Sequence, residues 1–290
     1  MDCTILLVSI AFNFLMSKKI RIDNCPFCYN DKLSEYCIDW QGNNYSKCID
    51  CNFVFQNVYE VYDYSKNYWG NIIDPDGIKR DLTRERDFKI NNWYGGIINF
   101  VNAMPGGRIL DVGCGLGYLL SAIDKGWEKI GFDVTDDSFD FINERFSGIS
   151  LFSGPIDTIS KKFGGNSFDV IVCYHVIEHL RNPAHFFKIL VNLLSTKGVL
   201  IIGTPNIKSF CARWFKGNYR LLGNGHICMF SPAHLKKLFE ENNMQVTKKE
   251  YPFFYTSYFT VKNLLRLINY NKVSPPFYGN AMTFYGLKKI

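Results

Sequence analysis

The stretch Ile109–Gly117, which reads Ile-Leu-Asp-Val-Gly-Cys-Gly-Leu-Gly, constrains the fold of this chain more than any other. The short apolar run Ile109–Val112 predicts a buried strand, and Tyr118–Lys125 predicts the helix that follows it. Glycines between a strand and a helix permit a positive φ and let a ligand approach the backbone closely. The start of such a helix presents unpaired N–H groups and the positive end of its dipole. The sequence therefore predicts an α/β domain with a ligand site at this turn.

From Arg108 onward, short apolar runs alternate with helical segments. The further strands are predicted at Lys129–Asp133, Ile149–Ser153, Phe168–Cys173, Val199–Gly203, Gln245–Tyr251 and Met282–Leu287. Helices are predicted at Asp137–Phe146, Asn182–Leu194 and Ser231–Asn242, and the last two begin with a polar N-cap followed by proline. This alternation is typical of a doubly wound, largely parallel sheet. We expect a Rossmann-like α/β fold with a seven-stranded sheet.

Asp111, just before the glycines, discriminates between two kinds of cofactor. A nicotinamide dinucleotide would place its negative pyrophosphate at this turn, and the carboxylate of Asp111 would repel it. The third glycine also comes two residues after the second, whereas the dinucleotide pattern places it three residues after. A cationic ligand would be attracted instead, by about 4 kcal/mol at about 4 Å and an effective dielectric near 20, before desolvation. The signs of the charges favour S-adenosylmethionine, which carries a sulfonium and an ammonium group.

A second acid, Asp133, comes at the end of the next predicted strand, 22 residues after Asp111. An acid about 20 residues after such a loop can accept hydrogen bonds from both ribose hydroxyls. The alternative is that Asp133 only caps the turn that follows it.

These segments together resemble class I S-adenosylmethionine-dependent methyltransferases. Ile109–Gly117 resembles the first motif of that class and Gly131–Val134 the second. The later segments resemble the subgroup related to quinol O-methylases and saccharide-pathway methyltransferases; they are Ser167–Ile171, His175–Leu180, Gly198–Asn206 and His226–Ser231. The resemblance covers about residues 100–290.

The resemblance implies which residues bind the cofactor. They are Asp111, Val112, Gly113, Cys114, Gly115, Gly117, Asp133, Val134, Ile156 and Tyr174. One position departs from the class, because Pro155 replaces the acid that often accepts a hydrogen bond from the adenine amino group. At this position only the backbone N–H of Ile156 remains to contact the adenine.

Four polar residues are candidates for chemistry on the acceptor. His175, Glu178 and His179 follow the fourth predicted strand at the ligand-binding edge of the sheet, at spacings of three and four residues. His175 or His179 could take a hydroxyl proton at neutral pH. The same group could instead be a buried hydrogen-bonded cluster, or a divalent metal site formed by Glu178 and a histidine. The resemblance adds His226, which would either line the acceptor pocket or bond to a backbone carbonyl.

The pairs Cys25/Cys28 and Cys48/Cys51 predict a structural zinc site. Each pair has the spacing C-x₂-C, and 19 residues separate the pairs. Two such turns facing each other provide four thiolates for tetrahedral zinc, which leaves no open position for catalysis. The segment resembles the small zinc ribbon that precedes some saccharide-pathway methyltransferases. The remaining cysteines show no paired spacing, as expected in a reducing, cytoplasmic setting.

Four regions follow from these assignments. Residues 1–19 are an extension of doubtful status, since Met16 could be the true start, and 20–60 are the zinc-ribbon-like module. Residues 61–104 are a helical linker, with Ile78–Ala103 helical and interrupted near Gly95, and 105–290 are the S-adenosylmethionine-binding methyltransferase domain. The apolar run Thr4–Met16 is shorter than the roughly 20 residues that span a bilayer, so no integral membrane segment is expected.

Charge narrows the choice of acceptor. The net charge is +6, and the basic residues are scattered. Residues 20–60 are net acidic, which argues against a zinc ribbon that grips RNA. The sequence predicts methylation of a small molecule or saccharide, with oxygen the expected acceptor atom, and does not favour nucleic acid as a partner. Two alternatives are an RNA methyltransferase that binds its substrate through the ribbon, and an inactive scaffold that still binds S-adenosylmethionine.

Overall fold

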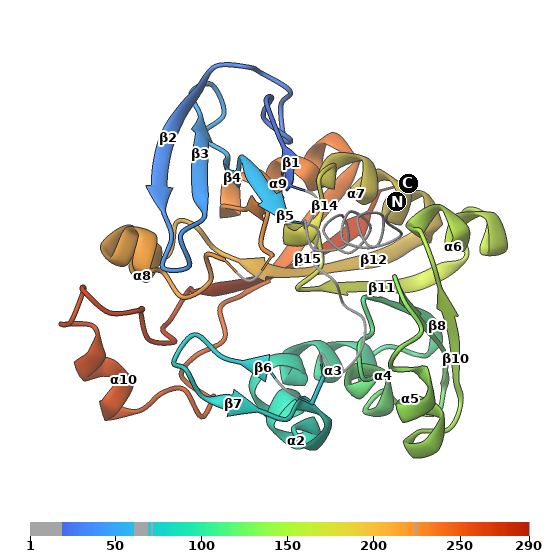
Figure 1. The fold of residues 1–290 in the computed structure, drawn as a ribbon. Helices are drawn as coiled ribbons and strands as arrows, with labels where there is room; N and C mark the ends of the chain where they lie inside the picture. Colours follow the sequence, from blue (N-terminus) through green and yellow to red (C-terminus); the bar gives the residue numbers. More distant parts are fainter. Residues whose placement is uncertain (1–18, 61–68, 71, 224, 290) are drawn as a thin grey trace, which may run out of the picture.

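The computed structural model describes residues 19–60, 69–70, 72–223 and 225–289. The N-terminal stretch with Met16, and part of the predicted linker, lie outside these residues. The centre of the structure is a seven-stranded sheet (Figure 1) in the order β10 (Ile149–Ser153), β9 (Trp127–Asp133), β8 (Gly107–Val112), β11 (Phe168–Tyr174), β12 (Leu194–Pro205), β15 (Ala281–Lys288) and β14 (Met244–Glu250). β15 runs antiparallel to both of its neighbours, and the other adjacent strands are parallel. The prediction of a largely parallel seven-stranded sheet is confirmed.

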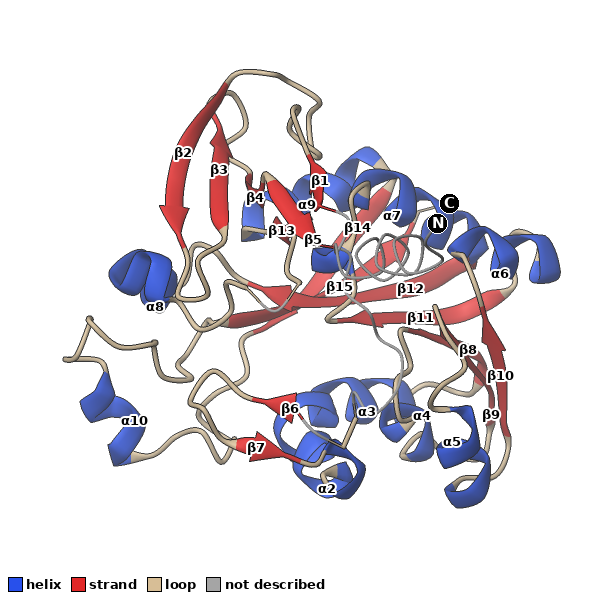
Figure 2. Cartoon of the chain, viewed as in Figure 1, coloured by secondary structure: helices blue, strands red, loops and turns tan. Residues whose placement is uncertain are grey.

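Helices cover both faces of the sheet, as Figure 2 shows. One face carries α6 (Ile156–Phe163), α7 (Pro183–Leu193) and α9 (Pro232–Glu241), and the other carries α3 (Gly95–Asn102), α4 (Tyr118–Ser121) and α5 (Phe139–Arg145). Each face has its own apolar core, one containing Phe187 and Phe239 and the other Ile97 and Leu120. The sheet is therefore doubly wound, because apolar side chains leave it in both directions.

The predicted N-caps are present at two helices. The Asn182 side chain accepts a hydrogen bond from the N–H of His185, and the Ser231 side chain accepts one from the N–H of His234. Proline follows each cap at the first helical position, where its missing N–H costs nothing. α6 and the short helix α8 (Phe210–Phe215) were not predicted.

The prediction of a helix over Tyr118–Lys125 is wrong in length, since α4 ends at Ser121. The Ser121 hydroxyl donates to the Tyr118 carbonyl, and the N–H groups of Ala122 and Ile123 bond three residues back instead of four. These contacts tighten the last turn and end the helix.

The predicted helix over Ile78–Ala103 is also corrected. Its first residues belong to a hairpin of β6 (Ile72–Ile73) and β7 (Lys79–Arg80) and to the 3₁₀ turn η1 (Leu82–Arg84). α2 (Arg86–Lys89) then continues through the π-turn η2 (Ile90–Tyr94) into α3, so the irregular segment precedes Gly95. The Asn92 amide donates to the Phe88 carbonyl and its oxygen accepts from the N–H of Ser257, which holds this turn in place.

The N-terminal module joins the large domain through shared strands. Its main sheet has the order β13 (Cys228–Met229), β4 (Val54–Gln56), β3 (Asn44–Cys48) and β2 (Leu33–Ile38), and β1 (Lys19–Arg21) pairs with β5 (Val58–Glu60). Because β13 belongs to the large domain, the boundary predicted at residue 60 does not separate two independent sheets.

The remaining elements are η3 (Ile177–His179), η4 (Lys216–Asn218) and α10 (Val261–Arg266). Within the described ranges, no helix has both the length and the apolar character needed to cross a bilayer.

Candidate functional site

A large cavity opens at the carboxyl ends of β8 and β11. The strand order reverses between these two strands, and ligands of open α/β sheets bind at such a switch point. The cavity has a volume of about 1540 Å³. This exceeds the roughly 300–1,000 Å³ of a single small-ligand pocket, so there is room for two molecules side by side.

The glycine loop closes one end of this cavity. Gly113, Gly115 and Gly117 all have a positive φ, at 77°, 49° and 70°. The N–H groups of Gly113 and Cys114 both donate to the Phe132 carbonyl, at 2.7 and 3.1 Å, which ties the loop to β9. A side chain at Gly113 would meet a Val176 methyl at 2.2 Å. The loop therefore requires glycine for both its conformation and its space.

Asp133 lies beside the loop with its carboxylate already oriented. One oxygen accepts from the Gly115 N–H at 2.9 Å, and the other accepts from the Val134 N–H at 2.8 Å. Each oxygen retains a second lone pair, and the residue lines the cavity. Both oxygens of Asp133 can therefore still accept the predicted hydrogen bonds from two neighbouring hydroxyl groups in the cavity.

Asp111 lies directly behind the lining residues Val112 and Gly113 and is only 4% exposed. Burial, with the nearby charge of Asp133, raises the pKa of Asp111 to about 8. Among the described residues, none forms a hydrogen bond or ion pair with its carboxylate. A buried carboxylate without a countercharge favours a cationic ligand nearby.

The other predicted cofactor residues also surround this end of the cavity. Cys114 and Tyr174 are buried and line it, Ile156 lines it from the first turn of α6, and Val134 lies at its exposed rim. Tyr174 packs so closely on Gly203 that a side chain there would meet its ring at 2.1 Å. The structure thus gathers all the predicted cofactor residues around one end of the cavity.

The cluster of His175, Glu178 and Thr204 occupies the neighbouring part of the site. His175 directly follows β11 with φ of 56°, and its N–H donates to the Gly203 carbonyl. Its Nδ1 lies 2.7 Å from Oε1 of Glu178, and the Thr204 hydroxyl donates to Oε2 at 2.9 Å. Burial alone would raise the pKa of Glu178, but His175, with smaller contributions from His226 and His179, lowers it to about 2. Glu178 is therefore a fully buried, ionised carboxylate that orients the His175 ring.

The tautomers of His179 and His226 follow from their partners. His179 Nδ1 lies 3.0 Å from the Gly225 carbonyl, and His226 Nδ1 lies 2.8 Å from the Leu221 carbonyl. Because a carbonyl only accepts, both Nδ1 atoms carry the proton and Nε2 is the basic nitrogen. Burial lowers the pKa of both rings, that of His226 to about 4. Both imidazoles are therefore neutral at pH 7.

The same cluster also has the spacing of a metal site. His175, Glu178 and His226 place one potential ligand atom each within 4.8 Å of one another. All three of the alternatives considered for these residues (base, buried network or metal ligands) are compatible with this geometry.

Several lining residues come from the segment that the sequence assigned to a linker. Trp69 lies against Gly115, Trp93 lies 5.8 Å from the His175 ring, and Tyr94 packs edge-on against Tyr174 at 5.4 Å. The only sequence signal was the abundance of aromatic residues in this segment. It could not show that a π-turn presents Trp93 and Tyr94 to the site.

The N-terminal module supports the loop 217–227, which carries His226. The Tyr45 hydroxyl donates to the His226 carbonyl at 2.8 Å and accepts from the Gly223 N–H at 2.9 Å. The indole of Trp40 donates to the Leu222 carbonyl, and the N–H of Gln56 donates to the Ile227 carbonyl. The turn 41–44 of the module also lines the cavity. The module is therefore part of the site.

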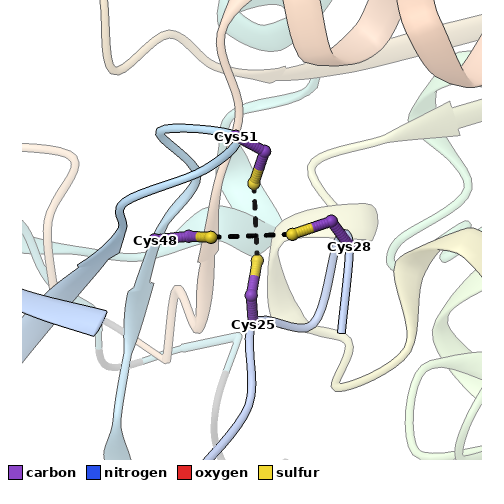
Figure 3. Close-up of side chains that lie close together, drawn as sticks. All are labelled: Cys25, Cys28, Cys48 and Cys51. Carbon is purple, nitrogen blue, oxygen red and sulfur yellow. Dashed lines mark hydrogen bonds between the residues drawn. The ribbon is translucent and has the colours of Figure 1, made fainter. Parts of the chain in front are cut away.

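The four predicted zinc ligands converge on one point (Figure 3). The Sγ atoms of Cys25 and Cys51 lie 3.6 Å apart, those of Cys28 and Cys48 lie 3.5 Å apart, and all four lie within 4.8 Å. Asn52 adopts the left-handed conformation after the second pair, whereas Tyr29 does so after the first. This arrangement is too open for disulfides, whose S–S distance is about 2.05 Å.

Sequence comparison identifies relatives of the chain. A family model described as "Methyltransferase domain" matches residues 94–249, which is more than half of the 290 residues. A Rickettsia bellii protein named "Ubiquinone biosynthesis O-methyltransferase" is 23% identical over 205 residues, covering 67% of this chain and 83% of that protein. An Actinobacillus pleuropneumoniae protein of the same name is 31% identical over 113 residues, covering 36% of this chain and 48% of that protein.

Solved structures share the fold. A SAM-dependent methyltransferase from Archaeoglobus fulgidus has a TM-score of 0.52 at 18% identity, covering 70% of this chain and 97% of that chain. The YcgJ protein of Bacillus subtilis has a TM-score of 0.52 at 19% identity, covering 68% of this chain and 97% of that chain.

Replacement of His226 by glutamine should reduce the loss of stability in acid. The unfolded histidine binds a proton below about pH 6.5 and the folded one only near pH 4, so stability is lost as pH falls between them. From pH 6.5 to pH 5 this amounts to about 2 kcal/mol. Urea unfolding at pH 7 and pH 5 should therefore show a drop about 2 kcal/mol smaller in the variant.

The exposed His185 on α7 provides the control. Between pH 7 and pH 5, His185→Gln should lose as much stability as the parent protein. An unchanged drop in the His226 variant would contradict burial of a neutral ring.

Proposed function

The chain belongs to the methyltransferase domain family and is an S-adenosylmethionine-dependent methyltransferase; from this premise, we propose that it methylates a hydroxyl oxygen of a small molecule or saccharide. We propose further that His175 is the base for that hydroxyl and that the N-terminal module binds structural zinc. The observation that carries the proposal is the chain of hydrogen bonds from Thr204 through Glu178 to His175.

The donor end of the cavity fits S-adenosylmethionine. This cofactor supplies a methyl group already activated on a sulfonium. Asp133 offers lone pairs for the ribose hydroxyls, while the uncompensated Asp111 favours the positive charge of the donor. Pro155 provides no side-chain acceptor for the adenine, which leaves the N–H of Ile156 in the first turn of α6 for that contact.

His175 is better placed than His179 to take the acceptor proton. Ionised Glu178 accepts from Nδ1–H of His175, so Nε2 is the free basic nitrogen of a ring that lines the cavity. When Nε2 takes the hydroxyl proton, the charge that develops on the ring is balanced by Glu178 at 2.7 Å. The Thr204 hydroxyl keeps the carboxylate aligned throughout.

The acceptor class rests on the lining of the cavity and on the relatives. Aromatic rings such as Trp93 and Tyr258, together with polar and basic side chains, line this cavity and suit a small hydroxylated molecule. The named relatives act, by their names, at oxygen. RNA is disfavoured because the module at the mouth carries Arg21, Lys32 and Lys47 against six acids within residues 20–60.

Zinc fits the four cysteines. A tetrahedral ion with Zn–S bonds of about 2.3 Å separates its sulfurs by about 3.8 Å. The two measured Sγ separations, 3.5 and 3.6 Å, are close to this value. All four ligands come from the protein, so the ion would support structure and take no part in chemistry.

The affinity of the protein for the methyl donor should rise as the pH increases toward the pKa of Asp111. Because the pKa of Asp111 is raised to about 8, the carboxyl must lose a proton to face a cation, and binding should release part of a proton. Calorimetry between pH 6 and pH 7.5 should show affinity for S-adenosylmethionine rising by at most about tenfold per pH unit. Asp111→Asn should weaken binding and abolish the pH dependence, whereas Asp124→Asn at an exposed position should change neither. If Asp111→Asn kept the pH dependence of the parent protein, the proton released on binding would belong to another group.

Turnover should depend on His175 much more than donor binding does. The protein is incubated with labelled S-adenosylmethionine and with each fraction of a cell extract separated into RNA, lipid, saccharide and small molecules. The product that becomes labelled is then characterised. With the active fraction, His175→Ala should lower kcat by about 10²–10⁴-fold. Glu178→Gln should shift the acid limb of the pH–rate profile. Both the His175→Ala and the Glu178→Gln variant should bind S-adenosylhomocysteine with the affinity of the parent protein. Label in RNA, or on nitrogen or carbon, would reject the acceptor assignment; full turnover of His175→Ala would reject the base.

Metal removal should loosen the site as well as the module. We expect one zinc per chain by mass spectrometry of the native protein, lost in Cys28→Ser but retained in Cys37→Ser, which changes a cysteine outside the cluster. Without the metal, amide exchange of residues 217–227 should accelerate, because Tyr45 and Gln56 of the module hold that loop. A metal-free native protein, or unchanged exchange after zinc loss, would contradict the proposal.

A further inference from the structure

The surface over α8 and α10 exposes a group of large apolar side chains. We call this group the apolar face; its members are Phe210, Trp214, Phe254, Phe259, Val261, Leu264, Leu265 and Ile268. Val261, Leu265 and Ile268 are 72%, 63% and 77% exposed, and Trp214 is 55% exposed. Single exposed apolar residues are ordinary, but a group of this size in two neighbouring segments indicates an interaction site.

Ring contacts link α8 to the segment before α10 through the buried ring of Phe253. Phe210 stacks on Trp214 with centroids 6.0 Å apart and contacts Phe277 at 5.8 Å. Phe277 contacts Phe253 at 5.1 Å, and Phe253 contacts both Phe254 and Phe259 just before α10. Both helices lie on the same side of the molecule in Figure 1. Phe253 and Phe277 also line the cavity, so the face adjoins its mouth.

The two segments that carry the apolar face contain basic residues and no acids. No Asp or Glu occurs between Glu178 and Glu240, and none follows Glu250. Arg213 and Lys216 lie at α8, Lys262 lies in α10 and Lys272 lies in the segment after it, and all four are exposed. No carboxylate of the described residues pairs with any of these four, whereas Arg266 is compensated by Asp76.

We propose that the apolar face docks this protein on an anionic lipid surface. Exposed aliphatic and aromatic side chains would enter the boundary between headgroups and acyl chains, and the lysines and arginines around them would contact the negative headgroups. A second copy of this chain is disfavoured, since a symmetric contact would bring the same uncompensated cations together. Nucleic acid would use the cations but not the aliphatic side chains of α10.

Co-sedimentation of the full chain with vesicles tests this proposal without depending on turnover. Binding to mixed phosphatidylcholine and phosphatidylglycerol vesicles should exceed binding to phosphatidylcholine alone by about tenfold or more. It should fall as salt rises.

Paired variants separate the two contributions. Leu265→Ser with Ile268→Ser should abolish insertion, and Lys262→Glu with Lys272→Glu should abolish the preference for anionic vesicles. Lys161→Glu with Lys188→Glu, exposed on α6 and α7, is the control for charge, and Ile73→Ser, 67% exposed on β6, is the control for apolar loss. S-adenosylhomocysteine affinity by calorimetry verifies that each variant is folded.

Three results would overturn the proposal. They are no vesicle binding, equal binding to neutral and anionic vesicles, and loss of binding in the control variants as large as in the face variants. Concentration-dependent dimers that the Leu265/Ile268 variant abolishes would instead assign the face to a second copy.

Discussion

The site depends on one buried charge. Glu178 has no exposed surface, yet its pKa lies near 2. The protein must therefore provide the hydrogen bonds that water would otherwise make to this carboxylate. It does so with His175 on one oxygen and Thr204 on the other, and with two further imidazoles nearby. A buried carboxylate left without such partners would be protonated or would destabilise the fold. The residues at the ends of β11 and β12 and the loop that carries His226 are therefore held in a single arrangement.

That arrangement connects two parts of the chain that are distant in sequence. His226 lies near Glu178 because the loop that carries it is fixed from the other side by the N-terminal module. Tyr45 satisfies both an N–H and a carbonyl of this loop, and β4 pairs with β13 directly after His226. Buried backbone groups need such partners, so the module and the loop stabilise each other. The N-terminal module therefore supports this part of the cavity through Tyr45 and β4.

Electrostatics separates the two ends of the cavity. Beside the glycine loop, Asp111 is buried and Asp133 is half-buried, and burial raises the pKa of both carboxyls, which favours a cation there. Between the ends of β11 and β12, Glu178 is ionised and hydrogen-bonded to His175 and Thr204, whereas His179 and His226 are neutral. The same type of side chain therefore has opposite roles at the two ends, according to whether the protein provides its partner.

The sequence alone determined what short-range physics controls. Glycines with positive φ, an acid after each of two apolar strands, proline after a polar N-cap and paired cysteines each restrict the backbone or chemistry locally, so the sheet, the loop and the thiolate cluster could be predicted. The π-turn at Ile90–Tyr94, the Tyr45 contact and the ionisation of Glu178 could not. Each depends on a partner from a distant segment: Ser257 fixes the turn through Asn92, the loop 217–227 binds Tyr45, and His226 joins His175 around Glu178. Burial and countercharge are properties of the assembled fold, and only the tertiary structure decides them.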